Sequence, residues 1–294
     1  MSVEEPLEEA AEPHLTPEQV KTLLGFVQQH NPVIIGGQAV NLWAELMYGM
    51  DAELDAFGAM TSKDLDFFHN KAAERTLAES LEGGLLEIPD GDNHTPNAAV
   101  VKGKLGDREV VVDFLAQVKG VEDKSLLENS ITFADADDPD NISITLMHPL
   151  DCVRSRLSNI NTLGRRDDHP VRQAAASILI LDCYIEHELS DPENKKAIRR
   201  AQDALHDLGY IVRDMHVGKP TELEFGGTLE PEWILRKYRE DNRLHPRLRE
   251  NQIQGSLDMI EERRELATKR RAATEEREAR RTDESGGATG PSIR

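Results

Sequence analysis

The segment from residue 32 to residue 68 constrains the fold of this chain most strongly. An apolar stretch, residues 32–35, ends in Gly36 and Gly37, and a helical pattern follows. An Asp-Leu-Asp-Phe sequence, residues 64–67, comes after that helix. The apolar stretch predicts a strand, and the two glycines predict a tight turn at which the backbone can approach a ligand. The chain therefore starts its core with a strand, a glycine turn, a helix and an acidic strand.

Three aspartates occupy strand-like positions. Side chains alternate between the two faces of a strand, so Asp64 and Asp66 share a face. Asp113 interrupts the apolar run 110–115, and a charge buried in a sheet is costly unless it is paired or bound to a metal. Hard oxygen ligands suit Mg²⁺ or Mn²⁺. We predict that these three carboxylates are catalytic and bind one divalent cation. The alternative is a pair of solvated acids on an edge strand.

The two glycines predict a phosphate site. The start of the following helix presents unpaired N–H groups and a positive dipole end, which favour phosphate. The alternative is that Gly36 and Gly37 form only a tight turn. The pattern is not a P-loop, because no Gly-Lys-Ser/Thr follows, and it lacks the third glycine of a dinucleotide fingerprint.

Together these motifs resemble the nucleotidyltransferase superfamily, whose pattern is an apolar residue, Gly-Gly or Gly-Ser, a spacer and Asp-apolar-Asp-apolar. Within it, the chain is similar to AbiEii-type toxin-related and uncharacterised bacterial nucleotidyltransferases. The resemblance is best over residues 31–115. The matching residues are Gly36, Gly37, Ala39, Ser62, Asp64, Asp66 and Phe67, with Asp113 at the place of the third acid.

The resemblance implies an α/β (α+β) fold, with a mixed-sheet core, flanking helices and a C-terminal helical domain. It implies transfer of a nucleoside monophosphate from an NTP to an acceptor, with release of pyrophosphate and with Mg²⁺ on Asp64 and Asp66. Two features depart from the pattern. The connection from Gly37 to Asp64 is longer than in the compact motif, and Gln38 stands where many relatives have a phosphate-binding serine. We expect Gln38 and Lys63 to contact the nucleotide.

The region after residue 147 carries a second signal. In the relatives, a helix after the sheet has a lysine near its start, and here Arg156 stands at that position. Arginine binds phosphate in a two-pronged geometry, so Arg156 is a predicted triphosphate ligand, with an exposed helical arginine as the alternative. Arg166 and Asp167 resemble a later Arg-Asp pair of the relatives, or form a loop ion pair. His148 is predicted to start the helix rather than to bind a metal.

Composition limits the partners. The chain has 294 residues and a net charge of −20, which argues against nucleic-acid binding over the whole surface. The stretch 235–249 is locally basic and predicts either a wall for an RNA acceptor or a set of ion pairs with the surplus acids. Cys152 and Cys183 have no zinc or disulfide spacing, which predicts reduced thiols, no disulfide partner and a cytoplasmic location. No apolar run predicts a membrane span.

Four segments follow from these patterns. We expect a disordered acidic tail (1–14), a nucleotidyltransferase domain (15–147), a helical domain (148–255), and a charged helix with a loose tail (256–294). The acceptor stays open among RNA, protein and small molecules, including a toxin-like target. The alternative function is a non-catalytic nucleotidyltransferase-fold binding or sensor module. The three acids favour an enzyme, because each costs stability when no metal is bound.

Overall fold

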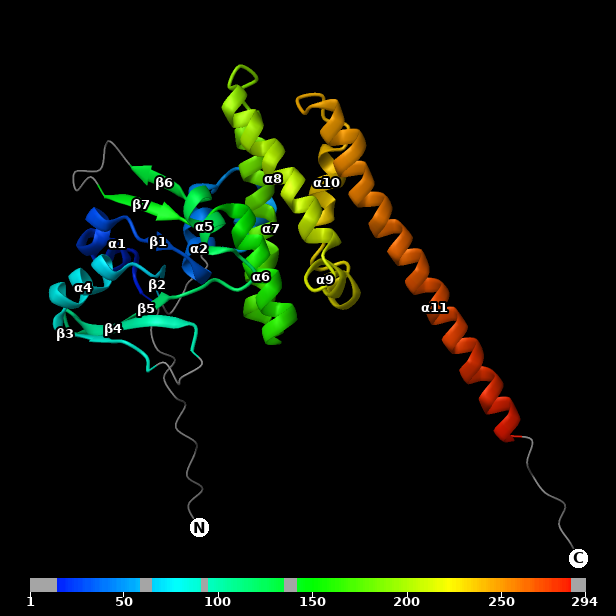
Figure 1. Ribbon diagram of the computed structural model, residues 1–294, viewed down its shortest axis with the longest axis horizontal. Helices are drawn as coiled ribbons and strands as arrows, with labels where there is room; N and C mark the ends of the chain where they lie inside the picture. The colour runs from blue at the N-terminus through cyan, green and yellow to red at the C-terminus, as the bar shows by residue number, and fades with distance from the viewer. Residues whose placement is uncertain (1–14, 59–64, 91–94, 135–141, 287–294) are drawn as a thin grey trace, which may run out of the picture.

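The computed structural model describes residues 15–58, 65–90, 95–134 and 142–286. The predictions on the two tails, on the loop at residues 135–141, and on Ser62, Lys63 and Asp64 lie outside the described residues. Figure 1 shows a sheet at one side of the molecule, the helices α6, α7 and α8 beside it, and α11 running away from the body.

A mixed sheet of seven strands forms the first part of the fold, in the order β3-β4-β5-β2-β1-β7-β6. The pairs β2–β5 and β1–β7 are parallel, whereas the other neighbours are antiparallel. The predicted mixed α/β fold is therefore confirmed. The strands are β1 Val33–Ile34, β2 Leu65–Phe68, β3 Glu82–Glu87, β4 Asn97–Leu105, β5 Arg108–Leu115, β6 Ile131–Ala134 and β7 Ser143–Leu146.

Helices cover the sheet, and after β7 the described residues form helices and the loops that join them. Those within the sheet region are α1 Pro17–Val27, α2 Gly36–Leu46, α3 Ala52–Ala56, α4 Lys71–Ser80 and α5 Asp123–Asn129. Those of the C-terminal region are α6 Pro149–Leu163, α7 Asp168–Leu189, α8 Lys195–Arg213, α9 Gly218–Phe225, α10 Glu232–Tyr238 and α11 Gln254–Gly286. A 3₁₀ turn, Gln28–His30, extends α1, and a π-helical turn, Leu248–Ile253, leads into α11. No helix in the described part of the chain is long and apolar enough to cross a membrane.

Local sequence signals explain several helix starts. Thr16 caps α1, with its side chain accepting from the Gln19 N–H and the Gln19 side chain accepting from the Thr16 N–H. This reciprocal capping box, with Pro17 at the first helical position, is a helix-start signal that the local sequence carries. His148 caps α6, because its Nδ1 atom accepts from the Leu150 N–H at 3.1 Å. The prediction that His148 starts this helix is confirmed.

One buried apolar cluster joins the sheet to the helices, and it runs from Val20 to Ile260. Trp43 on α2 lies at the junction. Its indole N–H donates to the Met147 carbonyl at 2.8 Å, and its ring packs edge-on against Phe133 and Tyr184. The side chain therefore ties α2 to the sheet and to α7 at once.

The start of α2 contains the predicted tight turn. Helix α2 begins at Gly36, whose φ of 71° is left-handed, so the chain turns sharply as it enters the helix. The elements α3, α5, β6 and α9 were not predicted, because short segments carry too few residues to show a period.

Candidate functional site

Asp66 and Asp113 are direct neighbours in the sheet. They are register partners in the parallel pair β2–β5, so their side chains leave the same face of strands about 4.8 Å apart. Both residues are half-buried. The Asn97 side chain on β4 donates to Asp113 Oδ1 at 3.0 Å and orients that carboxylate. The structure thus brings together the two predicted acids that it describes.

The start of α2 lies directly against the Asp66 carboxylate. The backbone N–H of Ile35 donates to the Asp66 carbonyl at 3.0 Å. Gly36 has a φ of 71°, and a Cβ atom at this position would collide with Asp66 Oδ2. Glycine is therefore required here twice, for the left-handed backbone and for the close approach of the carboxylate. The glycine turn and the acidic strand therefore meet at Gly36 and Asp66.

Gly37 is connected to Arg156 through the side chain of Gln173. A Cβ atom at Gly37 would lie 2.6 Å from Gln173 Nε2, so the α2 backbone packs on this α7 side chain. Gln173 is buried, and its Oε1 accepts from Arg156 Nη1 at 2.9 Å. The chain of contacts Gly37–Gln173–Arg156 places the guanidinium of α6 beside the start of α2.

Arg156 is a half-buried cation with an unused donor. Burial lowers the pKa of Arg156, whereas the Cys152 thiol and the Asp66 carboxylate act on it in the opposite direction. Its Nε atom is buried and has no hydrogen-bond partner within the described residues. An electropositive group with an unused N–H near a carboxylate pair is suited to a phosphate oxygen, since guanidinium forms charge-assisted hydrogen bonds.

Of the other two predicted nucleotide ligands, the structure describes Gln38, whereas Lys63 lies outside the described residues. Gln38 is mostly buried in the first turn of α2, where its Oε1 accepts from Asn41 Nδ2 at 3.4 Å. Its amide N–H₂ group keeps donors for a ligand.

Within the described residues, no group of three His, Cys, Asp or Glu side chains is placed to hold a metal ion. The third predicted ligand, Asp64, lies outside that part of the chain. The two oxygen-donor carboxylates Asp66 and Asp113 fit Mg²⁺ or Mn²⁺ as partial ligands.

The Arg166–Asp167 pair does not form. Arg166 makes an ion pair with Glu224 at 2.7 Å, and Asp167 is the N-terminal flanking residue of α7. The arginine therefore links the α6–α7 loop to α9.

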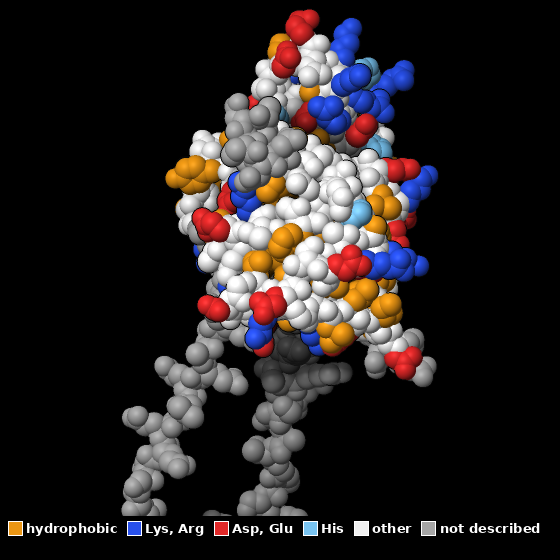
Figure 2. All heavy atoms as spheres, turned by 90° about the vertical axis from the view of Figure 1, so that its left-hand side faces the viewer, with side chains coloured by type: hydrophobic (Ala, Val, Ile, Leu, Met, Phe, Trp, Pro, Cys, Tyr) orange, Lys and Arg blue, Asp and Glu red, His pale blue; other side chains and the backbone are white. Residues whose placement is uncertain are grey.

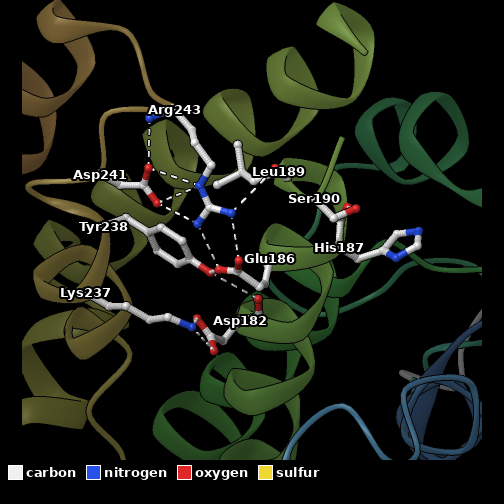
Figure 3. A network of polar contacts seen from close by, with 9 residues as sticks. All are labelled: Asp182, Glu186, His187, Leu189, Ser190, Lys237, Tyr238, Asp241 and Arg243. Atoms are coloured by element: carbon white, nitrogen blue, oxygen red, sulfur yellow. Dashed lines mark hydrogen bonds and ion pairs between the residues drawn. The ribbon is translucent and has the colours of Figure 1, made fainter. Parts of the chain in front are cut away.

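The basic stretch 235–249 is largely neutralised by neighbouring acids (Figure 3). Lys237 pairs with Asp182 at 2.7 Å, and Arg243 lies between Asp241 and Glu186. Tyr238 donates its hydroxyl to Glu186 Oε2 at 3.0 Å. The acids come from α7 and from the stretch itself. These contacts favour the ion-pair interpretation of the stretch over an RNA-binding wall.

The outer face of the sheet region offers no large area of one charge in the view of Figure 2. Lys and Arg side chains lie mostly toward the top of that view, and acidic and apolar side chains are scattered over the rest.

Cys152 and Cys183 are buried free thiols, and burial raises the pKa of Cys152 to about 12 and that of Cys183 to about 11.

Two residues of the site were not predicted. Gln173 and Asn97 are ordinary polar residues in the sequence, and their role depends on which helix covers α2 and on how the β4–β5 hairpin aligns.

Comparison of the chain with family models, with curated proteins and with solved structures gives no significant match. The functional assignment therefore depends on the geometry of the site.

Proposed function

We propose that this protein is a metal-dependent nucleotidyltransferase that transfers a nucleoside monophosphate from an NTP to an acceptor hydroxyl. One observation supports the proposal most: the Asp66–Asp113 carboxylate pair lies against the Gly36 start of α2. A metal–triphosphate needs carboxylate oxygens for the cation and N–H groups for the phosphates, and both kinds of group meet here.

Each residue has a role in this proposal. Asp66 and Asp113, with Asp64, would hold Mg²⁺ or Mn²⁺, which supplies charge neutralisation of the triphosphate. The first-turn N–H groups of α2 bind phosphate oxygens, and Gly36 and Gly37 let Asp66 and Gln173 pack against this turn. Arg156 donates to the triphosphate, and Gln173 holds its guanidinium in place. Gln38 and Lys63 complete the nucleotide contacts.

In the transfer step, the acceptor oxygen attacks the α-phosphorus of the NTP. The bond between that phosphorus and the bridging oxygen to the β-phosphate breaks, and pyrophosphate leaves with the electron pair. The acceptor proton moves to a carboxylate, for which Asp113 is the best candidate because Asn97 orients it. Catalysis then comes mainly from positioning and charge stabilisation.

The acceptor class is open among RNA, protein and small-molecule hydroxyls, which includes a toxin-like action on a cellular target. A cytoplasmic location fits two free thiols, since reducing compartments keep cysteines unpaired.

A non-catalytic nucleotide-binding or sensor module is the second candidate. It would use the same start of α2 and the same guanidinium of Arg156, and it would need no complete set of metal ligands. Such a module would bind NTP at the α2 start without releasing pyrophosphate.

A transfer assay separates the two candidates. The full chain is incubated with each α-labelled NTP and Mg²⁺, and with total RNA, extract protein or an extract filtrate as acceptor. We expect label transfer from wild type and a loss of at least about 10³-fold in Asp66→Asn and Asp113→Asn. Asp107→Asn is the matched control, because Asp107 lies in the exposed β4–β5 turn. Nucleotide binding without transfer to any acceptor pool would support the sensor module instead.

A further inference from the structure

A cavity that opens to solvent lies on the other side of α6 from the candidate transfer site. Its volume is about 490 Å³, and it is lined by residues of α5, the start of β6, and α6, α7 and α8. This volume is in the range of small-molecule sites. Arg154 of α6 lines the cavity, whereas Arg156 belongs to the transfer site. Residues two apart lie on opposite faces of a helix, so the two sites are separate.

The cavity lining is acidic. Five carboxylates from four helices line it, against the guanidinium groups of Arg154 and Arg200. His148 also lines it, and burial together with Arg200 lowers the pKa of this histidine to about 4, so it is neutral at pH 7. The five acids are Glu128 of α5, Asp151 of α6, Glu188 of α7, and Asp203 and Asp207 of α8.

Four of these five acids already have a basic neighbour. Glu188 pairs with Arg200 at 2.7 Å, and Asp203 pairs with Arg199 at 3.0 Å. Asp207 contacts His206 at 3.0 Å, and Glu128 lies 3.8 Å from Lys124. The fifth acid, Asp151, differs from them.

Among the five acids of the lining, Asp151 is the one with a buried oxygen that lacks a hydrogen-bond partner within the described residues, and the hydroxyl of Tyr184 in the same lining also lacks one. Its side chain is only 2% exposed, and its Oδ2 atom has no hydrogen-bond partner within the described residues. Arg154 and Asp207 act on Asp151 electrostatically, in opposite directions. Buried carboxylate oxygens are nearly always hydrogen-bonded, so this oxygen calls for a donor from a ligand in the cavity.

The arrangement of the acids selects the kind of cation. A metal ion needs several ligands at one point, and no group of three such side chains within the described residues is placed that way. The carboxylates are instead distributed over four helices, and the apolar side chains of Ile131, Leu150 and Ala204 line the same cavity. Separated charges with apolar surface between them match ammonium groups joined by methylene chains.

We propose that this cavity binds an aliphatic polyamine, with one ammonium group on Asp151 and the methylene chain along Ile131 and Leu150. The site goes beyond nucleotide transfer and does not depend on it. Arg154 and Arg200 keep the lining from being uniformly negative and oppose the binding of the cation.

Calorimetric titration of the full chain with spermidine tests this site. Wild type is expected to bind spermidine, and Asp151→Asn to bind it at least about tenfold more weakly, because the buried charge pair is lost. Asparagine keeps the shape of the side chain, and circular dichroism checks the fold. The matched control is Glu262→Gln, which removes one negative charge from the exposed surface of α11 and should leave the affinity unchanged.

A second variant makes the opposite prediction. Arg154→Gln removes a cation from the lining, so spermidine should bind several-fold more tightly, whereas an anionic ligand would bind more weakly. Three results would overturn the proposal: no binding of spermidine to wild type, equal binding by Asp151→Asn, or weaker binding by Arg154→Gln. Tighter binding of citrate than of spermidine by wild type would overturn it as well.

Discussion

Gly36 combines a φ of 71° with a position in which a Cβ atom would collide with the Asp66 carboxylate. Replacement by alanine adds backbone strain of about 1–2 kcal/mol and also forces the carboxylate or α2 to move. Gly164, at the end of α6, is the matched control, because it has a φ of 66° and open space around it. We expect Gly36→Ala to lower the free energy of unfolding in urea by at least about 1 kcal/mol more than Gly164→Ala. Equal losses would show that the close packing on Asp66 is relaxed in solution.

Asp151 makes stability depend on pH in a defined direction. Burial raises its pKa from 3.8 to about 6, so the native state holds a proton that the unfolded state releases between these values. The contribution of this group to stability therefore falls as the pH rises from 4 to 6. Asp151→Asn should raise the free energy of unfolding at pH 7.5 by about 2 kcal/mol and change it little at pH 4.

The measurement is urea unfolding of both proteins from pH 4 to pH 7.5. His148 acts in the opposite direction, because burial lowers its pKa from 6.5 to about 4 and the unfolded state takes up the proton first as the pH falls. The two effects flatten the wild-type profile, and the variant should show the histidine slope, with stability increasing up to pH 6.5. A variant that is less stable than wild type at pH 7.5 would contradict the burial of an ionised Asp151.

At the scale of elements, the contact between α7 and the segment after α10 depends on Arg243. Its guanidinium hydrogen-bonds Asp241, Glu186 and the Leu189 carbonyl, which joins the two segments (Figure 3). Arg243→Met should lower the free energy of unfolding by about 1 kcal/mol, since the pairs are partly exposed. The control Arg247→Met alters an exposed arginine of the same stretch and should stay within about 0.5 kcal/mol. Equal losses of unfolding free energy in the two variants would show that the hydrogen bonds of Arg243 do not stabilise this contact.

Helix α11 divides into a packed start and a solvated remainder. Leu257 and Ile260 are buried, and Arg264 pairs with Glu222 and Glu232, whereas the side chains from Glu265 to Arg277 are almost all exposed. A chain ending at Lys269 should therefore keep its melting temperature within about 2 °C, and one ending at Gln254 should lose several degrees. Thermal unfolding followed at 222 nm distinguishes them. A large drop in melting temperature for the chain that ends at Lys269 would indicate that the part of α11 after Lys269 makes stabilising contacts.

The elements differ in how far the sequence predicts them. The capping box at Thr16 and the hairpin turn at Gly106 are local signals that a few neighbouring residues carry. The shared face of Asp66 and Asp113 was expected from an isolated acid in an apolar strand, but their register depends on the parallel pairing of β2 with β5. Gln173 depends on the packing of α7 on α2, for which the sequence carries no local signal.

At the scale of the whole molecule, the buried cluster crosses the predicted domain boundary at residues 147 and 148. Trp43 of α2 contacts Met147 and Tyr184, so the sheet region shares its core with the helices. We expect a single calorimetric transition for the full chain, with equal calorimetric and van't Hoff enthalpies. The fragment 15–147 alone should be unstable, because separation exposes this shared surface. Two resolved transitions, or a stable fragment, would show that the two regions are independent.

The central claim is that Asp66 and Asp113 act together on one metal–nucleotide. The most direct test is a double-mutant cycle on the binding of Mn²⁺ with α,β-methylene ATP, measured by calorimetry for wild type, Asp66→Asn, Asp113→Asn and the double variant. Ligands of one ion are strongly coupled, so each single variant should lose at least about tenfold in affinity and the double variant little more than either. Additive losses, or unchanged affinity in the single variants, would contradict a shared site.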